Sequence, residues 1–225
     1  MPGNAVQGNV GRPVAIVGAG GHGRVILDAV RSAGGRVLGF LDDSPLMRGR
    51  EVSGARVLGG LELAQSLARD EGAAFIVGIG DNIVRGRVIR RLLEWGLPLT
   101  SAIHARAVVA PDVVVGLGVV VMPGAVVNTG SSLGMGAVVN TSASLDHDNE
   151  LMEGAHAMPG ATLAGAVIVG RYATVGSGAV VLPGVRIGDN AYVGAGAVAR
   201  KDVMPDTVVV GVPARFLRQQ EPLPF

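Results

Sequence analysis

His147 lies in the run with the clearest chemical potential, Asp146-His147-Asp148. An imidazole can take a proton from an attacking nucleophile, and a carboxylate bonded to it raises its pKa and fixes its tautomer. The run therefore predicts a general base at His147 with Asp148 as its partner. The alternative is a solvated surface histidine without a chemical role.

A glycine-rich run, Gly18-Ala-Gly-Gly-His-Gly23, is the second candidate site. It stands between an apolar run that predicts a buried strand and a run that predicts a helix. Gly18, Gly20 and Gly23 satisfy G-x-G-x-x-G, and the backbone N–H groups at such a helix start suit phosphate oxygens. The alternative is a tight turn without a ligand.

Asp42 and Asp43 follow this run at the distance where a dinucleotide-binding domain places the acid that binds its ribose. The region is too short for both halves of a full dinucleotide site. A single nucleotide, or a nucleotide joined to a sugar, is therefore favoured over NAD. The first 100 residues carry 12 arginines and 9 acidic residues, which also favours an anionic ligand.

The elements around these two runs alternate between strand and helix. Strands are predicted at 14–17, 36–41 and 73–79, and helices at 24–30, 61–69 and 83–95. This alternation predicts a small parallel sheet with helices on its faces. We assign residues 14–100 to this Rossmann-like domain and residues 1–13 to a disordered polar tail.

From Ile103 to Ala199 an aliphatic residue returns at every sixth position. There are 17 such positions in unbroken phase, of which 15 are Ile, Val or Leu and two are Ala. A period of six is typical of a parallel β-helix in which three hexapeptides make one coil of 18 residues. We assign residues 101–211 to this β-helix, and residues 212–225 to a C-terminal tail with one or two helical turns.

This repeat places the candidate base. His147 falls two positions after Leu145, which predicts a side chain pointing away from the β-helix. Gly165 takes the same place one coil later, and adjacent strands lie about 4.8 Å apart, so its N–H is predicted near the imidazole. A base beside a donor for a developing oxyanion is what acyl transfer needs. His156 lies half a coil beyond His147, so a site that used both would lie between subunits.

The composition excludes several classes of protein. Of the 225 residues 48% are hydrophobic and 16% charged, which excludes intrinsic disorder. The chain has no cysteine, which excludes disulfides, thiolate metal sites and cysteine nucleophiles. The net charge of +1 predicts no nucleic-acid partner, and no apolar run reaches the length of a membrane span. A cytoplasmic protein is expected. A zinc site would need histidines that lie close together. No metal is expected, because His104 lies more than two coils from His147.

Taken in order, several runs resemble a family of bacterial sugar acetyltransferases, the sialic-acid O-acetyltransferases and nucleotide-sugar N-acetyltransferases. The runs that carry the resemblance are Gly18–Gly23, Gly39–Asp43, Gly80–Asn82, Asn140–Ser142, Asp146–Asp148, His156 and Gly211–Arg215. The resemblance covers nearly the whole chain. It implies a left-handed β-helix, a homotrimer, and acetyl-CoA bound between neighbouring β-helices.

The resemblance also implies roles for single residues. His147 would match the catalytic base and Asp148 its supporting carboxylate, which is Glu in several relatives. The candidate cofactor contacts are His156, Gly165, Gly176 and Gly194. The candidate contacts of a nucleotide sugar are Gly18, Gly20, Gly21, His22, Gly23, Asp42, Asp43, Asn82 and Asn140.

Three functions fit these observations. The first is N-acetylation, by direct transfer from acetyl-CoA, of the amine of a nucleotide-linked 4-amino-4,6-dideoxy sugar. The second is O-acetylation of sialic acid or another sugar hydroxyl. The third is a non-catalytic trimer that senses nucleotides or supports assembly. The nucleotide-like N-terminal region favours the first, and the Asp146–Asp148 run argues against the third.

Overall fold

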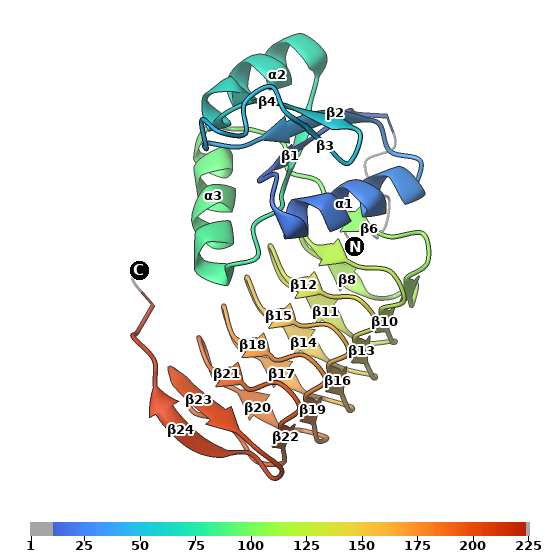
Figure 1. Ribbon diagram of the computed structural model, residues 1–225. Coiled ribbons are helices and arrows are strands. Elements are labelled where there is room, and N and C mark those ends of the chain that lie inside the picture. The colour runs from blue at the N-terminus through green and yellow to red at the C-terminus, as the bar shows by residue number, and fades with distance from the viewer. Residues whose placement is uncertain (1–10, 224–225) are drawn as a thin grey trace.

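The computed structural model describes residues 11–223, which form two stacked parts. Figure 1 shows a sheet covered by helices above a long column of short strands. The tail predicted at 1–13 lies mostly outside the described residues. Within the described range no helix is both long and apolar enough to span a membrane.

The N-terminal part is a mostly parallel sheet with helices on both faces. Its elements are β1 (Val14–Val17), α1 (Gly21–Ser32), β2 (Val37–Leu41), β3 (Glu51–Val52), β4 (Ala55–Gly59), a 3-10 turn (Leu61–Leu63), α2 (Ala64–Glu71), β5 (Ala74–Val77) and α3 (Asn82–Glu94). The strand order is β3-β4-β2-β1-β5, and only the short β3 pairs antiparallel, with β4. The predicted parallel sheet is confirmed, whereas the sequence pattern did not predict the β3–β4 hairpin.

α1 lies between the sheet and the column of strands (Figure 1). Its buried Ile26 and Leu27 share one apolar cluster with Phe40 of the sheet and with Val120 and Val138 of the column. α2 and α3 cover the opposite face of the sheet, in a second cluster. The two parts of the molecule therefore share an apolar core through α1.

The column consists of 17 two-residue strands spaced six residues apart. They are β6 (Ala102–Ile103), β7 (Val108–Val109), β8 (Val114–Val115), β9 (Val120–Val121), β10 (Val126–Val127), β11 (Ser132–Leu133), β12 (Val138–Val139), β13 (Ser144–Leu145), β14 (Glu150–Leu151), β15 (His156–Ala157), β16 (Thr162–Leu163), β17 (Ile168–Val169), β18 (Thr174–Val175), β19 (Val180–Val181), β20 (Arg186–Ile187), β21 (Tyr192–Val193) and β22 (Val198–Ala199).

Each strand from β6 to β19 pairs in parallel with the strand three places further on, so that residues 18 apart are neighbours. Every strand ends on one of the 17 periodic positions, and the aliphatic side chains at these positions pack into one core. The hexapeptide prediction is confirmed, and the column is a left-handed parallel β-helix with three faces.

The C-terminal end differs from the prediction. β23 (Thr207–Val210) continues one face of the β-helix beside β21, and β24 (Arg215–Gln219) folds back antiparallel on β23. The helical turns predicted after residue 211 are therefore wrong. All five residues of β24 are exposed, so its backbone pairing with β23, rather than a buried apolar face, makes it a strand.

Candidate active site

The candidate base and its carboxylate lie at a corner of the β-helix, between β13 and β14. His147 Nδ1 is 2.8 Å from Asp148 Oδ2, and Asp146 Oδ1 accepts a hydrogen bond from the His147 backbone N–H at 2.9 Å. Both side chains of the pair are more than half exposed. The predicted pairing of His147 with Asp148 is therefore present on the outer surface of the column.

An unusual turn makes this pairing possible. Asp148 has a φ of +59°, in the left-handed region, which turns its side chain back toward the preceding histidine. Asn149 stands four residues after Leu145, where the other repeats carry Ala, Val or Ser. It is buried, and its Nδ2 donates to the carbonyl oxygens of Asp146 and Ala164 at 2.7 and 3.0 Å. Asn149 thus bonds the corner that carries the His147–Asp148 dyad to the next coil.

Gly165 lies directly beneath the imidazole. A Cβ atom at this position would stand 2.5 Å from His147 Cε1 and 2.6 Å from Nε2. The Gly165 N–H donates no hydrogen bond to any residue that the structure describes. The glycine therefore provides both the space for the ring and a free donor beside it.

The electrostatics of the corner suit a base. The hydrogen bond that Asp148 accepts from His147, and after it the charge of Asp146, raise the pKa of His147 above the ordinary value of 6.5. The nitrogen bonded to Asp148 carries the proton in the neutral ring, because a carboxylate accepts but does not donate. Nε2 is then the nitrogen that can accept a proton.

A cavity of about 470 Å³ lies between the N-terminal part and the face of the β-helix that carries β15, β18 and β21. Among the residues lining it are His22, Asn82, Asn140 and His156. The structure thus brings together four of the predicted ligand contacts, which come from the glycine-rich run, the start of α3 and two coils of the β-helix.

Two neutral histidines face each other in this cavity, with ring centroids 6.1 Å apart. Asn140 Oδ1 accepts from the Thr141 N–H, which leaves its Nδ2 to donate to His156 Nε2 at 3.0 Å. Burial, and then the charge of Arg85, lower the pKa of His22 to about 4. The same two causes, and the charge of His22, lower the pKa of His156 to about 3.

Arg85 is a residue of this region that sequence reasoning missed. It is fully buried, and its five N–H groups donate to the carbonyl oxygens of four residues and to Asn82 Oδ1. The four carbonyl acceptors are those of Ile79, Gly80, Gly136 and Gly154, at 2.9–3.1 Å. Arg85 therefore bonds α3 to two coils of the β-helix. The signal in the sequence is its place on the apolar stripe of α3 that continues with Ile89 and Leu92.

The glycine-rich run forms the turn from β1 into α1 as predicted. α1 begins after Gly20 without a side-chain cap and without an acidic residue in its first turn. Asp42 accepts the Ala19 N–H at 2.9 Å and the Ser44 N–H at 3.0 Å, so both of its oxygens hold the turn. Asp43 accepts only the Leu61 N–H, at 2.8 Å, within the part of the chain that the structure describes.

Two predicted cofactor contacts lie apart from the dyad. Gly176 and Gly194 follow β18 and β21, on the face that carries His156, and a Cβ on either would collide with the next coil at 2.5 or 2.7 Å. Their role toward a cofactor stays a prediction. Within residues 11–223 no group of three His, Asp or Glu side chains is arranged to hold a metal ion.

Comparison with known proteins supplies the context of these sites. The family model described as the PglD N-terminal domain matches residues 13–92. The perosamine N-acetyltransferase from Caulobacter crescentus, solved as a histidine-to-asparagine variant with CoA and GDP-perosamine, is 39% identical. The match covers 93% of this chain and 98% of that chain, with a TM-score of 0.87.

Two other solved structures share the same architecture. The acetyltransferase domain of PglB from Neisseria gonorrhoeae FA1090, in complex with acetyl coenzyme A, is 34% identical over 92% of this chain and 99% of that chain, with a TM-score of 0.86. WeeI from Acinetobacter baumannii AYE is 25% identical over 92% of this chain and all of that chain, with a TM-score of 0.80.

Proposed function

This chain belongs to the hexapeptide-repeat family of nucleotide-sugar N-acetyltransferases, and from that premise we propose that it transfers an acetyl group from acetyl-CoA to the amine of a nucleotide-linked 4-amino-4,6-dideoxy sugar. The observation that carries the proposal is the His147–Asp148 pair, whose imidazole lies against Gly165, a residue whose N–H donates no hydrogen bond among residues 11–223. These groups supply a base and an oxyanion donor at one place.

In the proposed reaction the sugar amine attacks the thioester carbonyl carbon. His147 Nε2 accepts a proton from the amine, and the Gly165 N–H donates to the oxygen that becomes negative. One such donor is typically worth about 2.7–4 kcal/mol of barrier. The C–S bond then breaks, the proton passes from His147 to the leaving thiolate, and the products are an amide and CoA. Transfer is direct, because the chain has no cysteine and no evident serine nucleophile to carry the acetyl group.

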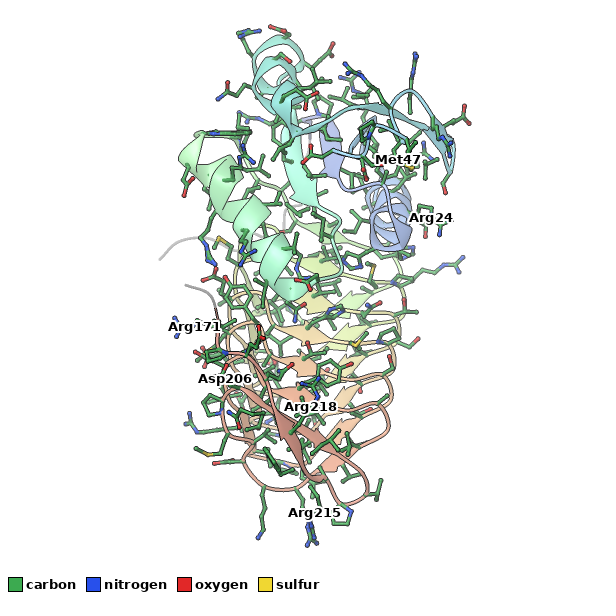
Figure 2. All side chains as sticks on the ribbon, turned by 60° about the vertical axis from the view of Figure 1, so that its left-hand side comes forward. Arg24, Met47, Arg171, Asp206, Arg215 and Arg218 are labelled. Atoms are coloured by element: carbon green, nitrogen blue, oxygen red, sulfur yellow. The ribbon has the colours of Figure 1, made fainter. Side chains whose placement is uncertain are left out.

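Acetyl-CoA is proposed to lie along the corner of the β-helix that continues below the His147–Asp148 pair. Gly165, Pro183 and Lys201 stand one coil apart, so the cationic end of this column lies about 10 Å below Gly165 at roughly 4.8 Å per coil. A cavity of about 470 Å³ at that end is lined by Arg200, Lys201 and Arg215 among others. Figure 2 shows Arg215 at the end of the column farthest from the N-terminal part. These cations suit the phosphates of CoA.

The nucleotide sugar is proposed to lie across the carboxyl ends of the N-terminal strands. The uncapped start of α1 after Gly20 offers free N–H groups to its diphosphate. The sugar would occupy the cavity of His22, Asn82, Asn140 and His156. The buried His22 Nε2 has no hydrogen-bond partner in the described part of the chain, which leaves it available to this ligand.

A homotrimer is part of the proposal. The face built from β7, β10, β13, β16, β19 and β22 presents uncharged outward residues, which are Val108, Val126, Ser144, Thr162, Val180 and Val198. An uncharged face suits close packing against another copy of the chain. His147 lies at the corner between the faces of β13 and β14, and His156 lies on the third face, so a shared site would need two subunits. We place the enzyme in the cytoplasm, where its two substrates are made.

The test is thiol release from acetyl-CoA with UDP-, GDP- and dTDP-linked 4-amino sugars and with free sialic acid. Turnover of one nucleotide amino sugar is expected. Turnover of sialic acid alone would replace the proposal with O-acetylation, and absence of both turnover and CoA binding would favour a sensing or assembly role.

A His147→Ala variant tests the assigned base. Its kcat should fall by about 100-fold or more, because general-base catalysis contributes on that scale, whereas CoA binding stays near that of the unmodified enzyme. A near-normal rate would remove His147 from this role.

A further inference from the structure

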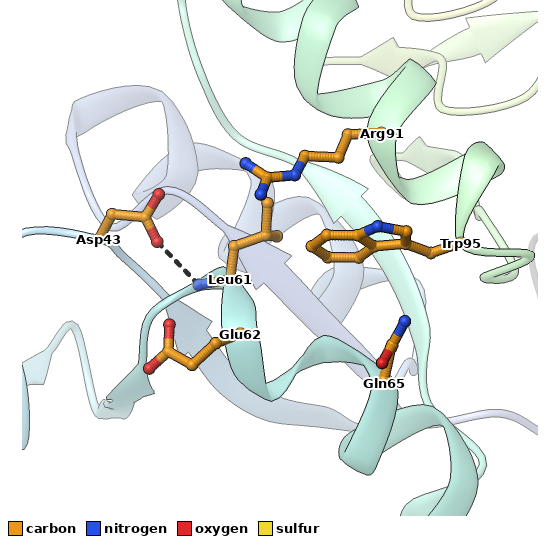
Figure 3. Close-up of a pocket in the computed structure, with 6 residues that line it drawn as sticks. All are labelled: Asp43, Leu61, Glu62, Gln65, Arg91 and Trp95. Atoms are coloured by element: carbon orange, nitrogen blue, oxygen red, sulfur yellow. Dashed lines mark hydrogen bonds between the residues drawn. The ribbon is translucent and has the colours of Figure 1, made fainter.

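A second cavity of the N-terminal part takes no part in the steps described above. Its volume is about 420 Å³, and it lies beyond the carboxyl ends of β2 and β4. Figure 3 shows the residues that line it, which are Asp43, Leu61, Glu62, Gln65, Arg91 and Trp95. Ligands of open α/β sheets bind in the crevice outside the carboxyl ends of the strands, so the position indicates a ligand site.

Two carboxylates form one wall of this cavity. Asp43 Oδ1 accepts the Leu61 N–H at 2.8 Å and Glu62 Oε1 accepts the Gly60 N–H at 3.2 Å. A Cβ on Gly60 would touch both carboxylates, which therefore flank the same glycine. Each keeps its second oxygen without a hydrogen-bond partner among residues 11–223. The wall thus offers two neighbouring acceptors.

Arg91 of α3 and Trp95, the residue that follows the end of this helix, form the opposite wall. The Arg91 guanidinium lies over the indole ring at 4.8 Å from its centroid. Figure 3 shows it extending over Leu61 toward Asp43. Across residues 11–223, however, no ion pair joins Arg91 to Asp43 or Glu62. The cavity therefore holds a cation and two carboxylates that do not neutralise each other.

We propose that this cavity binds the base of the nucleotide sugar and selects guanine. Guanine presents two adjacent donors, N1–H and the 2-amino group, which match the free oxygens of Asp43 and Glu62. Its O6 and N7 acceptors match the N–H groups of the Arg91 guanidinium, which the Trp95 indole holds in place. Uracil and thymine present a single ring N–H between two carbonyl oxygens, and two carboxylates would repel those oxygens.

The cavity lies at a suitable distance from the proposed sugar site. Asn82 lines the sugar cavity and Arg91 lines this one, and nine residues of α3 separate them. At about 1.5 Å per helical residue the separation is about 13–14 Å. The glycine-rich turn at 18–23 stands between the ends of β1 and β2, where the diphosphate would pass. The inference rests on the proposed function and names its nucleotide.

Trp95 makes the test direct, because it is the sole tryptophan of the chain. Titrations of the full chain with GDP, UDP, dTDP and ADP are followed by tryptophan fluorescence and by calorimetry. GDP is expected to change the Trp95 emission and to bind about tenfold or more tightly than the other three. Equal affinity for GDP and UDP, or tighter binding of a pyrimidine nucleotide, would overturn the proposal.

Variants locate the selectivity. Glu62→Gln and Arg91→Gln should each weaken GDP binding by about tenfold or more and leave UDP binding nearly unchanged. Glu71→Gln and Arg87→Gln are matched controls, because these exposed residues lie outside the cavity, Glu71 at the end of α2 and Arg87 on α3. GDP affinity unaffected by both cavity variants would overturn the site, whatever the preference among nucleotides.

The two proposals fail in different ways. Selective GDP binding with no acetyl transfer to any GDP-linked amino sugar would support the guanine site and refute the acetyltransferase function proposed for this chain. Acetyl transfer to a UDP-linked amino sugar, at rates untouched by Glu62→Gln, would refute the guanine site and leave the acetyltransferase function in place.

Discussion

Gly130 provides the space that the Asp148 carboxylate occupies beside His147. It stands one coil above Asp148, and a Cβ at this position would overlap Asp148 Oδ1. Gly184 lies in the same corner column with nearly the same φ, +72° against +71°, and nothing lies within 4 Å of its Cβ position. A substitution by alanine therefore brings the same backbone strain to both sites. Only the substitution at Gly130 also displaces the Asp148 carboxylate.

We expect Gly130→Ala to lower kcat/KM by about 10–100-fold, because the dyad loses its alignment. The acid limb of the pH profile should also move to lower pH, since the Asp148 hydrogen bond is the main cause that raises the pKa of His147. Gly184→Ala should leave both unchanged. In an Asp148→Asn background the Gly130 substitution should add little, and a full additional loss there would show that Gly130 does not act through Asp148.

His156 links folding stability to pH. Its folded pKa of about 3 lies below the ordinary 6.5, so the unfolded chain binds this proton first. The stabilisation is complete above pH 6.5 and is lost as the pH falls from 6.5 toward 3. We expect the unfolding free energy of the unmodified protein to fall more steeply than that of His156→Gln, by about 1.4 kcal/mol per pH unit. Parallel denaturation curves between pH 7 and 5 would contradict a buried neutral His156.

The residues of the candidate site differ in how far the sequence could predict them. The approach of His147 to Gly165 follows from a period of 18 residues per coil, which fixes neighbours along the column. Arg85 and Gly130 could not be found in this way. Two of the acceptors of Arg85, the carbonyl oxygens of Gly136 and Gly154, lie in the β-helix rather than in its own domain, and the role of Gly130 depends on the side-chain direction of Asp148.

α3 docks on a corner of the β-helix that glycines keep flat. Gly118, Gly136 and Gly154 succeed one another at 18-residue steps, and all have φ near +67°. Ile89 of α3 lies over the first two, and the Tyr172 ring fits against Gly154 and against Gly86 of α3. The next corner residue of this column, Tyr172, also contacts α3, since Asn82 Nδ2 donates to its carbonyl oxygen at 3.0 Å. The three glycines therefore leave room for the side chains that join α3 to the β-helix.

Gly154→Ala tests this contact between elements. Its Cβ would stand 2.5 Å from the Tyr172 ring, whereas Gly178, with a φ of +65° against +66°, has open space at the same point. Both substitutions carry the strain of the left-handed region, and Gly154→Ala adds overpacking of about 1–3 kcal/mol. We expect it to lower the unfolding free energy by that much more than Gly178→Ala does. Equal losses, measured by chemical denaturation, would show that the Tyr172 ring moves aside without cost.

The predictability of the elements depends on which force forms them. The 17 strands of the β-helix end at the predicted aliphatic positions because each must bury one side chain in a narrow core. β24 has no buried face, and β3 spans two residues, so neither leaves an apolar pattern to read. Their backbone pairing becomes evident only once β23 and β4 are in place.

At the scale of the whole molecule, one chain separates the groups that the proposed reaction needs. His147 and Gly165 lie at one corner of the β-helix, and the cavity with His156 and Asn140 opens on another face beside the N-terminal part. A ring of three copies would bring the corner of one subunit to the cavity of its neighbour, since cyclic assemblies repeat one heterologous contact.

Co-expressed His147→Ala and His156→Ala chains should regain activity that neither variant has alone. In a ring whose sites combine His147 of one chain with His156 of the next, every mixed trimer contains one intact site. Random association then leaves about a quarter of all sites intact, so the mixture should reach about a quarter of the unmodified rate. The two variants purified separately and never co-assembled are the control. A mixture as inactive as its components would mean that each site is complete within one chain. The thioester oxygen that accepts from the Gly165 N–H would then have to be reached by a sugar bound to the same subunit.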